Sequence, residues 1–135
     1  MRSKILLVTA ITAFFATHSA ISQNKWADAK ITSQPVSGTV HMLEGMGGNI
    51  GVSAGPEGIL IIDDQYAPLA EKIAAAIDNI SNTKIRYIVN THYHGDHTGS
   101  NAYFKEVEGS TIFAHDNVRK RLAEKEEHTH AELPV

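Results

Sequence analysis

The stretch of residues 90–99 constrains this chain more than any other, because it holds four side chains that can bind a metal ion. The four lie within six consecutive positions and are His92, His94, Asp96 and His97. They directly follow an apolar, β-branched run at residues 84–89, which predicts a buried strand. Sites of α/β proteins form at the ends of strands, so this placement favours a metal site over a set of solvated surface histidines.

The spacing within the loop indicates how the ligands could be shared. His92 and His94 are two positions apart, and alternate side chains of an extended segment point the same way. Gly95 is expected to turn the backbone sharply, so that Asp96 and His97 project from the turned segment. The loop is therefore expected to hold two adjacent ions, one at each pair of side chains.

The composition limits the metal and the partners. The chain has no cysteine, so disulfides and thiolate ligands are excluded. Zinc suits the imidazole, carboxylate and water that remain, with iron and manganese as alternatives. The formal net charge is −3, and no basic surface for nucleic acid or polybasic membrane patch is indicated. We expect a small-molecule substrate, no nucleic acid and no stable membrane anchor.

Residues 1–22 have the order of a secretory signal peptide: a short cationic start, an apolar run at residues 5–15, and then small residues. The run is shorter than the ~20 residues that a membrane-spanning helix needs, which disfavours an uncleaved anchor. We expect cleavage before Gln23, or alternatively after Ala20. The mature chain, residues 23–135, is then expected to be secreted, into a bacterial periplasm.

Strand and helix patterns alternate along the mature chain. Apolar or alternating runs predict strands at residues 31–36, 39–44, 49–54, 59–62, 85–89 and 111–114. Helices are expected at residues 68–80, at residues 100–104, and after Asp116 as a cap. The continuous apolar run at residues 59–62 predicts a strand covered on both faces. The order predicts an α/β fold, a mixed sheet with helices on one face at least.

Polar residues beside the loop could support metal ligands. Asp63 and Asp64 end the strand at residues 59–62. One could orient a ligand imidazole and the other could cap the coming helix, and we assign the first role to Asp63. Thr91, next to the first histidine of the loop, could hydrogen-bond ligand atoms in the same way.

Residues 91–99 resemble the signature of the metallo-β-lactamase-fold hydrolase superfamily. Supporting similarity runs from about residue 40 to residue 122 and is carried by residues 47–49, 58–63 and 85–90. The resemblance implies a four-layer αββα sandwich of two similar halves, of which residues 23–135 would be the truncated N-terminal αβ half. Many β-lactamases of this fold have cysteine or arginine where this chain has His97. The histidine points to the broader hydrolase branch, or to the lactamase subgroup with an all-His/Asp site.

The resemblance also implies roles for individual residues. The positions matching His92 and His94 bind a first zinc, those matching Asp96 and His97 bind a second, and the one matching Asp63 supports them. Asp96 is also our candidate catalytic residue. A metal-bound hydroxide would then open an amide, lactone, thioester or phosphoester bond.

The family uses three further ligands, a histidine, a bridging aspartate and a last histidine, which by this resemblance lie beyond Val135. His115 lies between a strand and a helix, which favours capping or packing. His128 and His130 lie in a charged run and are expected to be solvated. The alternative function is therefore a truncated, non-catalytic fragment that binds metal weakly or not at all. Such a half sandwich would expose an apolar sheet face and self-associate through it.

Overall fold

The computed structural model describes residues 25–131, with side chains described as far as residue 125. The predicted signal peptide at residues 1–22 lies outside this range, and export therefore stays a prediction. Within residues 25–131, no helix is both long enough and apolar enough to cross a membrane.

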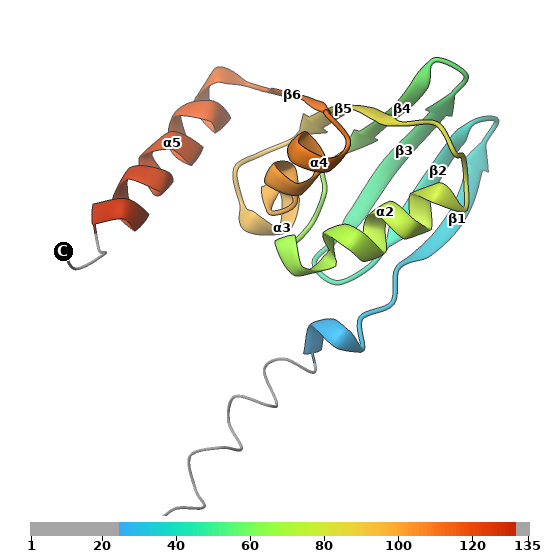
Figure 1. Cartoon of the computed structure of the whole chain (residues 1–135), viewed down its shortest axis with the longest axis horizontal. Coiled ribbons are helices and arrows are strands. Elements are labelled where there is room, and N and C mark those ends of the chain that lie inside the picture. Colours follow the sequence, from blue (N-terminus) through green and yellow to red (C-terminus); the bar gives the residue numbers. More distant parts are fainter. Residues whose placement is uncertain (1–24, 132–135) are drawn as a thin grey trace, which may run out of the picture.

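Six strands form one mixed sheet in which the spatial order follows the chain (Figure 1). They are β1 (Thr32–Ser37), β2 (Val40–Glu44), β3 (Asn49–Gly55), β4 (Gly58–Ile62), β5 (Ile85–Asn90) and β6 (Thr111–Ala114). The first four pair antiparallel, whereas β4, β5 and β6 run parallel. Every predicted strand is confirmed to within one residue at each end.

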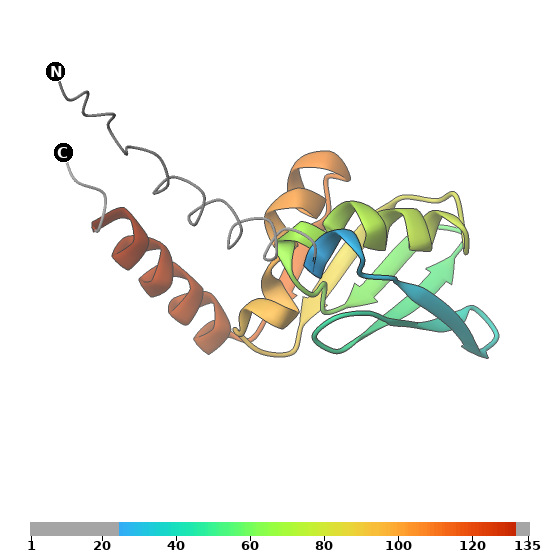
Figure 2. The same ribbon diagram turned by 90° about the horizontal axis from the view of Figure 1, so that it is seen from below.

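The helices connect the parallel strands and follow the last one. They are η1 (Ala67–Leu69), α2 (Ala70–Asp78), α3 (Gly95–Thr98), α4 (Asn101–Val107) and α5 (Asp116–Ala131). Figure 2 shows α2 and α4 on the same face of the sheet. The α/β prediction, with a mixed sheet and helices on one face, is confirmed. The one-turn helix α3 lies within residues 91–99, the candidate metal-binding loop, and was not predicted.

The core lies between the sheet and α2. In the strand register, Leu43 of β2 pairs with Ile50 of β3, and both side chains are fully buried. Ile73 and Ile77 of α2 are four positions apart, so they project from one face of the helix onto these strands. Apolar burial of this kind is worth about 1.5–3 kcal/mol for each large side chain, and it accumulates on this one face.

The opposite face of the sheet is apolar and largely open. Ile59 and Ile61 of β4 are buried under the helices, whereas Ile62 keeps 43% of its surface exposed. Tyr87 of β5 and Phe113 of β6 lie on the same open face, 38% and 51% exposed, with ring centroids 5.9 Å apart. The prediction that β4 is covered on both faces is therefore wrong for the described residues. A continuous apolar run does not reveal whether the second face is covered within the same segment.

The segment before β1 is held against α2. Lys72 donates hydrogen bonds from its Nζ to the carbonyls of Trp26 and Ala29, both at 2.8 Å. The Trp26 ring packs on Tyr66 with centroids 5.0 Å apart. Trp26 is the only tryptophan of the chain, so its fluorescence can report on the packing of this region.

We expect the chain to self-associate through the open face, because a contiguous apolar surface on a soluble protein favours association. Replacing Ile62 and Phe113 together by threonine should shift the chain toward monomer in light scattering across a concentration series. Val107→Thr is the matched control, since this side chain is 59% exposed but lies on α4, away from the open face. A chain that is monomeric at every concentration would contradict the expectation.

Candidate metal centre

The candidate metal-binding loop begins where two parallel strands end side by side. β4 and β5 are neighbours, and the Asp63 N–H donates to the carbonyl of Val89 at 2.9 Å, which continues their pairing beyond β4. The first residue after β5, Thr91, therefore lies next to Asp63. This is the edge at which open α/β sheets build their sites.

The loop then forms the one-turn helix α3, for which His94 is the N-cap residue. The His94 carbonyl accepts the N–H groups of His97 at 3.0 Å and Thr98 at 3.1 Å. This turn brings Asp96 and His97 back toward His92. One ligand atom from each of these three side chains lies within 4.8 Å of the other two.

A chain of hydrogen bonds fixes both imidazoles of this group. His97 donates from Nδ1 to the Asp63 carboxylate at 2.8 Å. The Thr91 hydroxyl donates its one proton to the same carboxylate at 2.8 Å. It can therefore only accept from Nδ1 of His92, 3.0 Å away. Both rings are thus assigned the tautomer that leaves Nε2 free to bind a metal, the usual arrangement of metal-binding histidines.

His94 is close to the cluster but outside it. Its exposed ring lies 4.8 Å from the His92 ring, centroid to centroid, and 4.6 Å from that of Tyr93. The structure thus brings together one residue of the first predicted pair and both residues of the second. The pairing of His92 with His94 on a separate ion stays a prediction.

The backbone at His97 is anchored by two groups behind the loop. Its carbonyl accepts the N–H of Asp64 at 3.1 Å and the side-chain amide of Asn90 at 3.0 Å. The Asn90 side-chain carbonyl in turn accepts from Asn101 at 2.8 Å. Sequence reasoning missed Asn90, although a buried amide at the end of an apolar strand needs a hydrogen-bond partner and could have signalled this role.

Asp64 holds the end of the loop. It makes no capping hydrogen bond to the following helix, η1. Its carboxylate is fully buried and accepts the Ser100 N–H at 3.0 Å. Burial raises the pKa of Asp64 to about 7, aided by the charge of Asp63 and opposed by the hydrogen bond from Ser100. Asp63 contacts the ring of a candidate ligand, as predicted, whereas the helix-capping role predicted for the other acid is wrong, because Asp64 holds the backbone of the loop.

Two glycines of the loop have unequal structural roles. A Cβ atom at Gly95 would meet no atom within 4 Å, and its φ is not positive. The backbone does turn at Gly95, as predicted, but the turn does not require the conformational freedom of glycine. A Cβ atom at Gly99 would lie 2.6 Å from the Gly95 carbonyl and 2.7 Å from that of Gln65. Gly99 is the position that permits close packing of the loop against the segment after β4.

Of the three histidines that follow the loop in the sequence, the structure describes the side chain of the first. His115 precedes α5 and accepts the Asn117 N–H on its Nδ1 at 3.1 Å. This confirms capping for His115 and shows that Asp116, predicted as the cap, is the first helical residue. The side chains of His128 and His130 lie outside the described part.

The donor set fits a divalent ion. His97 Nε2 and Asp96 Oδ2 lie 3.4 Å apart. Two ligands at ~2.0 Å from a tetrahedral zinc would be separated by roughly 3.3 Å. Two imidazoles and one carboxylate also match the three protein ligands that catalytic zinc sites commonly use. The fold and the site together define a mixed α/β protein with a candidate metal centre at the carboxyl edge of its sheet.

A family model described as "Metallo-beta-lactamase superfamily" matches residues 44–134, and the chain belongs to this superfamily. No match was found among the curated proteins.

Solved structures show the same fold over part of their length. MEM-A1, a subclass B3 metallo-beta-lactamase from a soil metagenome library, is 27% identical with a TM-score of 0.57. The match covers 64% of this chain and 33% of MEM-A1. FIM-1 from Pseudomonas aeruginosa, described in its mono-zinc form, is 18% identical with a TM-score of 0.63, over 72% of this chain and 47% of FIM-1. The chain thus spans a third to a half of the lengths of these two proteins.

Gly99→Ala should displace the loop, because the added methyl group would meet backbone atoms that cannot move independently. We expect a loss of about 1–3 kcal/mol in unfolding free energy and weaker metal binding, measured by urea unfolding and by metal titration. Gly95→Ala is the matched control and should leave stability nearly unchanged. Equal effects at the two positions would contradict the packing role of Gly99.

The raised pKa of Asp64 predicts a pH dependence of stability. The folded state holds this proton more tightly than the unfolded state, so the contribution of Asp64 is most favourable below the unfolded pKa of 3.8. It is lost as the pH rises toward about 7, with a slope of at most about 1.4 kcal/mol per pH unit.

Asp64→Asn should abolish this part of the pH dependence, because the amide does not ionise and still accepts the Ser100 N–H. The measurement is unfolding of metal-free protein between about pH 4 and pH 8, followed by Trp26 fluorescence. Parallel stability curves for the two proteins would show that Asp64 does not titrate in this window.

Proposed function

We propose that the chain carries the metal-binding loop of a zinc-dependent hydrolase acting on an amide, lactone, thioester or phosphoester bond of a small molecule. The observation that supports this best is the convergence of ligand atoms from His92, Asp96 and His97 within 4.8 Å. Membership of the metallo-beta-lactamase superfamily supports the class of metal-dependent hydrolases.

Two residues that hydrogen-bond the candidate ligands orient them for metal binding. Asp63 and Thr91 hold the His92 and His97 rings with Nε2 free, so ligand nitrogens need no reorganisation on binding. A bound divalent ion would lower the pKa of water and polarise a carbonyl or phosphoryl oxygen. Asp96 is only partly buried and presents Oδ2 to the same cluster. We assign it both a ligand role and the orientation of the attacking water.

A second candidate function is a fragment that binds metal weakly or not at all and has no catalytic activity. The observation that favours it is the coverage of the structural matches, 33% of MEM-A1 and 47% of FIM-1. The described cluster also has three close ligands for what was expected to be two ions. A site with one three-ligand ion and a site with two ions would differ in metal stoichiometry.

Metal analysis and hydrolysis assays on the purified chain test both candidates. We expect zinc to bind, and His97→Ala to weaken zinc binding by more than about 100-fold, since it removes a ligand held by Asp63. His115→Ala is the matched control, because this histidine is exposed and caps α5. Iron and manganese are compared in the same titrations.

The hydrolysis panel contains a chromogenic cephalosporin, a lactone, a thioester and an aryl phosphodiester. Turnover that is lost with a chelator and in His97→Ala supports the hydrolase. Zinc binding without any turnover favours the non-catalytic fragment, and absence of zinc binding contradicts the zinc-dependent function.

A further inference from the structure

The exposed face of α5 that carries Lys120 and Arg121 lies beside the metal-binding loop. Lys120, Arg121 and Glu124 lie three, four and seven positions after Asn117, so these four residues share one side of this helix. Val118 and Leu122, four positions apart, lie on a different, apolar side of the helix, and Val118 is buried with 6% exposure. The packing of that apolar side turns the basic side outward.

The basic side shares a cavity with the loop. A cavity of about 730 Å³ is lined by Tyr93 of the loop and by the residues Asn117, Lys120, Arg121, Glu124 and Lys125 of α5. Lys120 and Arg121 are cationic and Glu124 is anionic, so the charge of these three lining side chains is positive in a chain whose total charge is negative. Such a local excess attracts anions.

Arg121 is held in place beside the metal ligands. Its guanidinium carbon lies 4.6 Å from the centre of the Tyr93 ring, a cation–π contact. The His94 ring lies at the same distance from that ring on the neighbouring residue of the loop. Arg121 and His94 are therefore separated by at most twice this distance, within the span of a small-molecule substrate.

The two cations are available to a ligand. Among the side chains described, neither Lys120 nor Arg121 has a carboxylate within ion-pair distance. Guanidinium groups bind carboxylate and phosphate through paired N–H groups, and ammonium groups add a point charge. We propose that Lys120 and Arg121 form a subsite for the anionic group, carboxylate or phosphate, of a small molecule whose reacting bond lies at the metal centre. Its role in substrate choice rests on the proposed function, but anion binding itself does not.

Anion binding is tested on the whole chain after metal has been removed and the chelator exchanged away. The probes are inorganic phosphate and acetate, with acetamide as the uncharged control, titrated into isotope-labelled protein. Backbone amide signals of Tyr93, Lys120 and Arg121 should shift with about millimolar affinity for both anions and not for acetamide. A response to phosphate alone identifies a phosphate subsite, and a response to acetate alone a carboxylate subsite.

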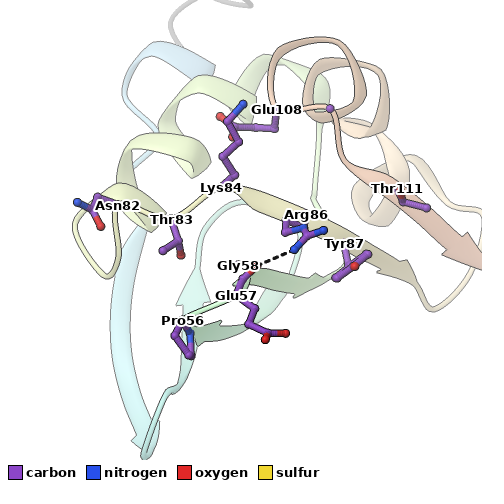
Figure 3. Close-up of a pocket in the computed structure, with 11 residues that line it drawn as sticks. Pro56, Glu57, Gly58, Asn82, Thr83, Lys84, Arg86, Tyr87, Glu108 and Thr111 are labelled. Atoms are coloured by element: carbon purple, nitrogen blue, oxygen red, sulfur yellow. Dashed lines mark hydrogen bonds between the residues drawn. The ribbon is translucent and has the colours of Figure 1, made fainter.

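Lys120→Ala combined with Arg121→Ala should weaken this binding by about tenfold or more. The matched control removes the same charge at the opposite edge of the sheet, by Lys84→Ala with Arg86→Ala. These two line another cavity, where Arg86 donates to the Glu57 carbonyl at 3.0 Å (Figure 3). Anion shifts that persist in the first double variant, or that acetamide reproduces, would overturn the subsite even if the metal centre proves active.

Discussion

The hydrogen bonds to the Asp63 carboxylate are the interactions on which the candidate metal-binding loop depends. The carboxylate accepts three hydrogen bonds, from the Thr91 N–H, the Thr91 hydroxyl and His97 Nδ1, all at 2.8 Å. Asp63 has a φ of 62°, in the left-handed region, which costs a non-glycine residue about 1–2 kcal/mol. Each hydrogen bond to a charged group is worth about 1.5–3 kcal/mol, so the three together offset the backbone strain. The strained backbone conformation directs the carboxylate toward the loop, and the hydrogen bonds formed there stabilise it.

The loop is held by hydrogen bonds to its backbone as well as by those to its histidine rings. The His97 carbonyl is held by Asp64 and Asn90, and the Ser100 N–H is held by the Asp64 carboxylate. These groups come from the ends of β4 and β5, whose parallel pairing is part of the buried core. The positions of the candidate ligands therefore follow from the packing of the sheet.

Local sequence patterns were enough to predict the sheet, and tertiary contacts account for what they missed. Strand periodicity and turn residues located all six strands, because each signal lies within a few neighbouring residues. The roles of Gly99 and Asn90 depend on contacts with residues far along the chain or on the opposite side of the loop. Likewise, the apolar run in β4 predicted burial, but only the register shows that Ile62 and Tyr87 lie on the open face.

Three of the four predicted ligands converge in the structure, but the sequence did not predict their geometry. Spacing in an extended segment favoured His92 with His94, whereas helix α3 turns the chain at His94 and brings Asp96 and His97 to His92. The same turn leaves His94 exposed between the cluster and Tyr93, on the side where Arg121 lies. His94 thus occupies the boundary between the metal ligands and the basic face of α5. A substrate bound across this boundary would meet a cationic group and the metal centre together, so that His94 could affect both metal binding and substrate orientation.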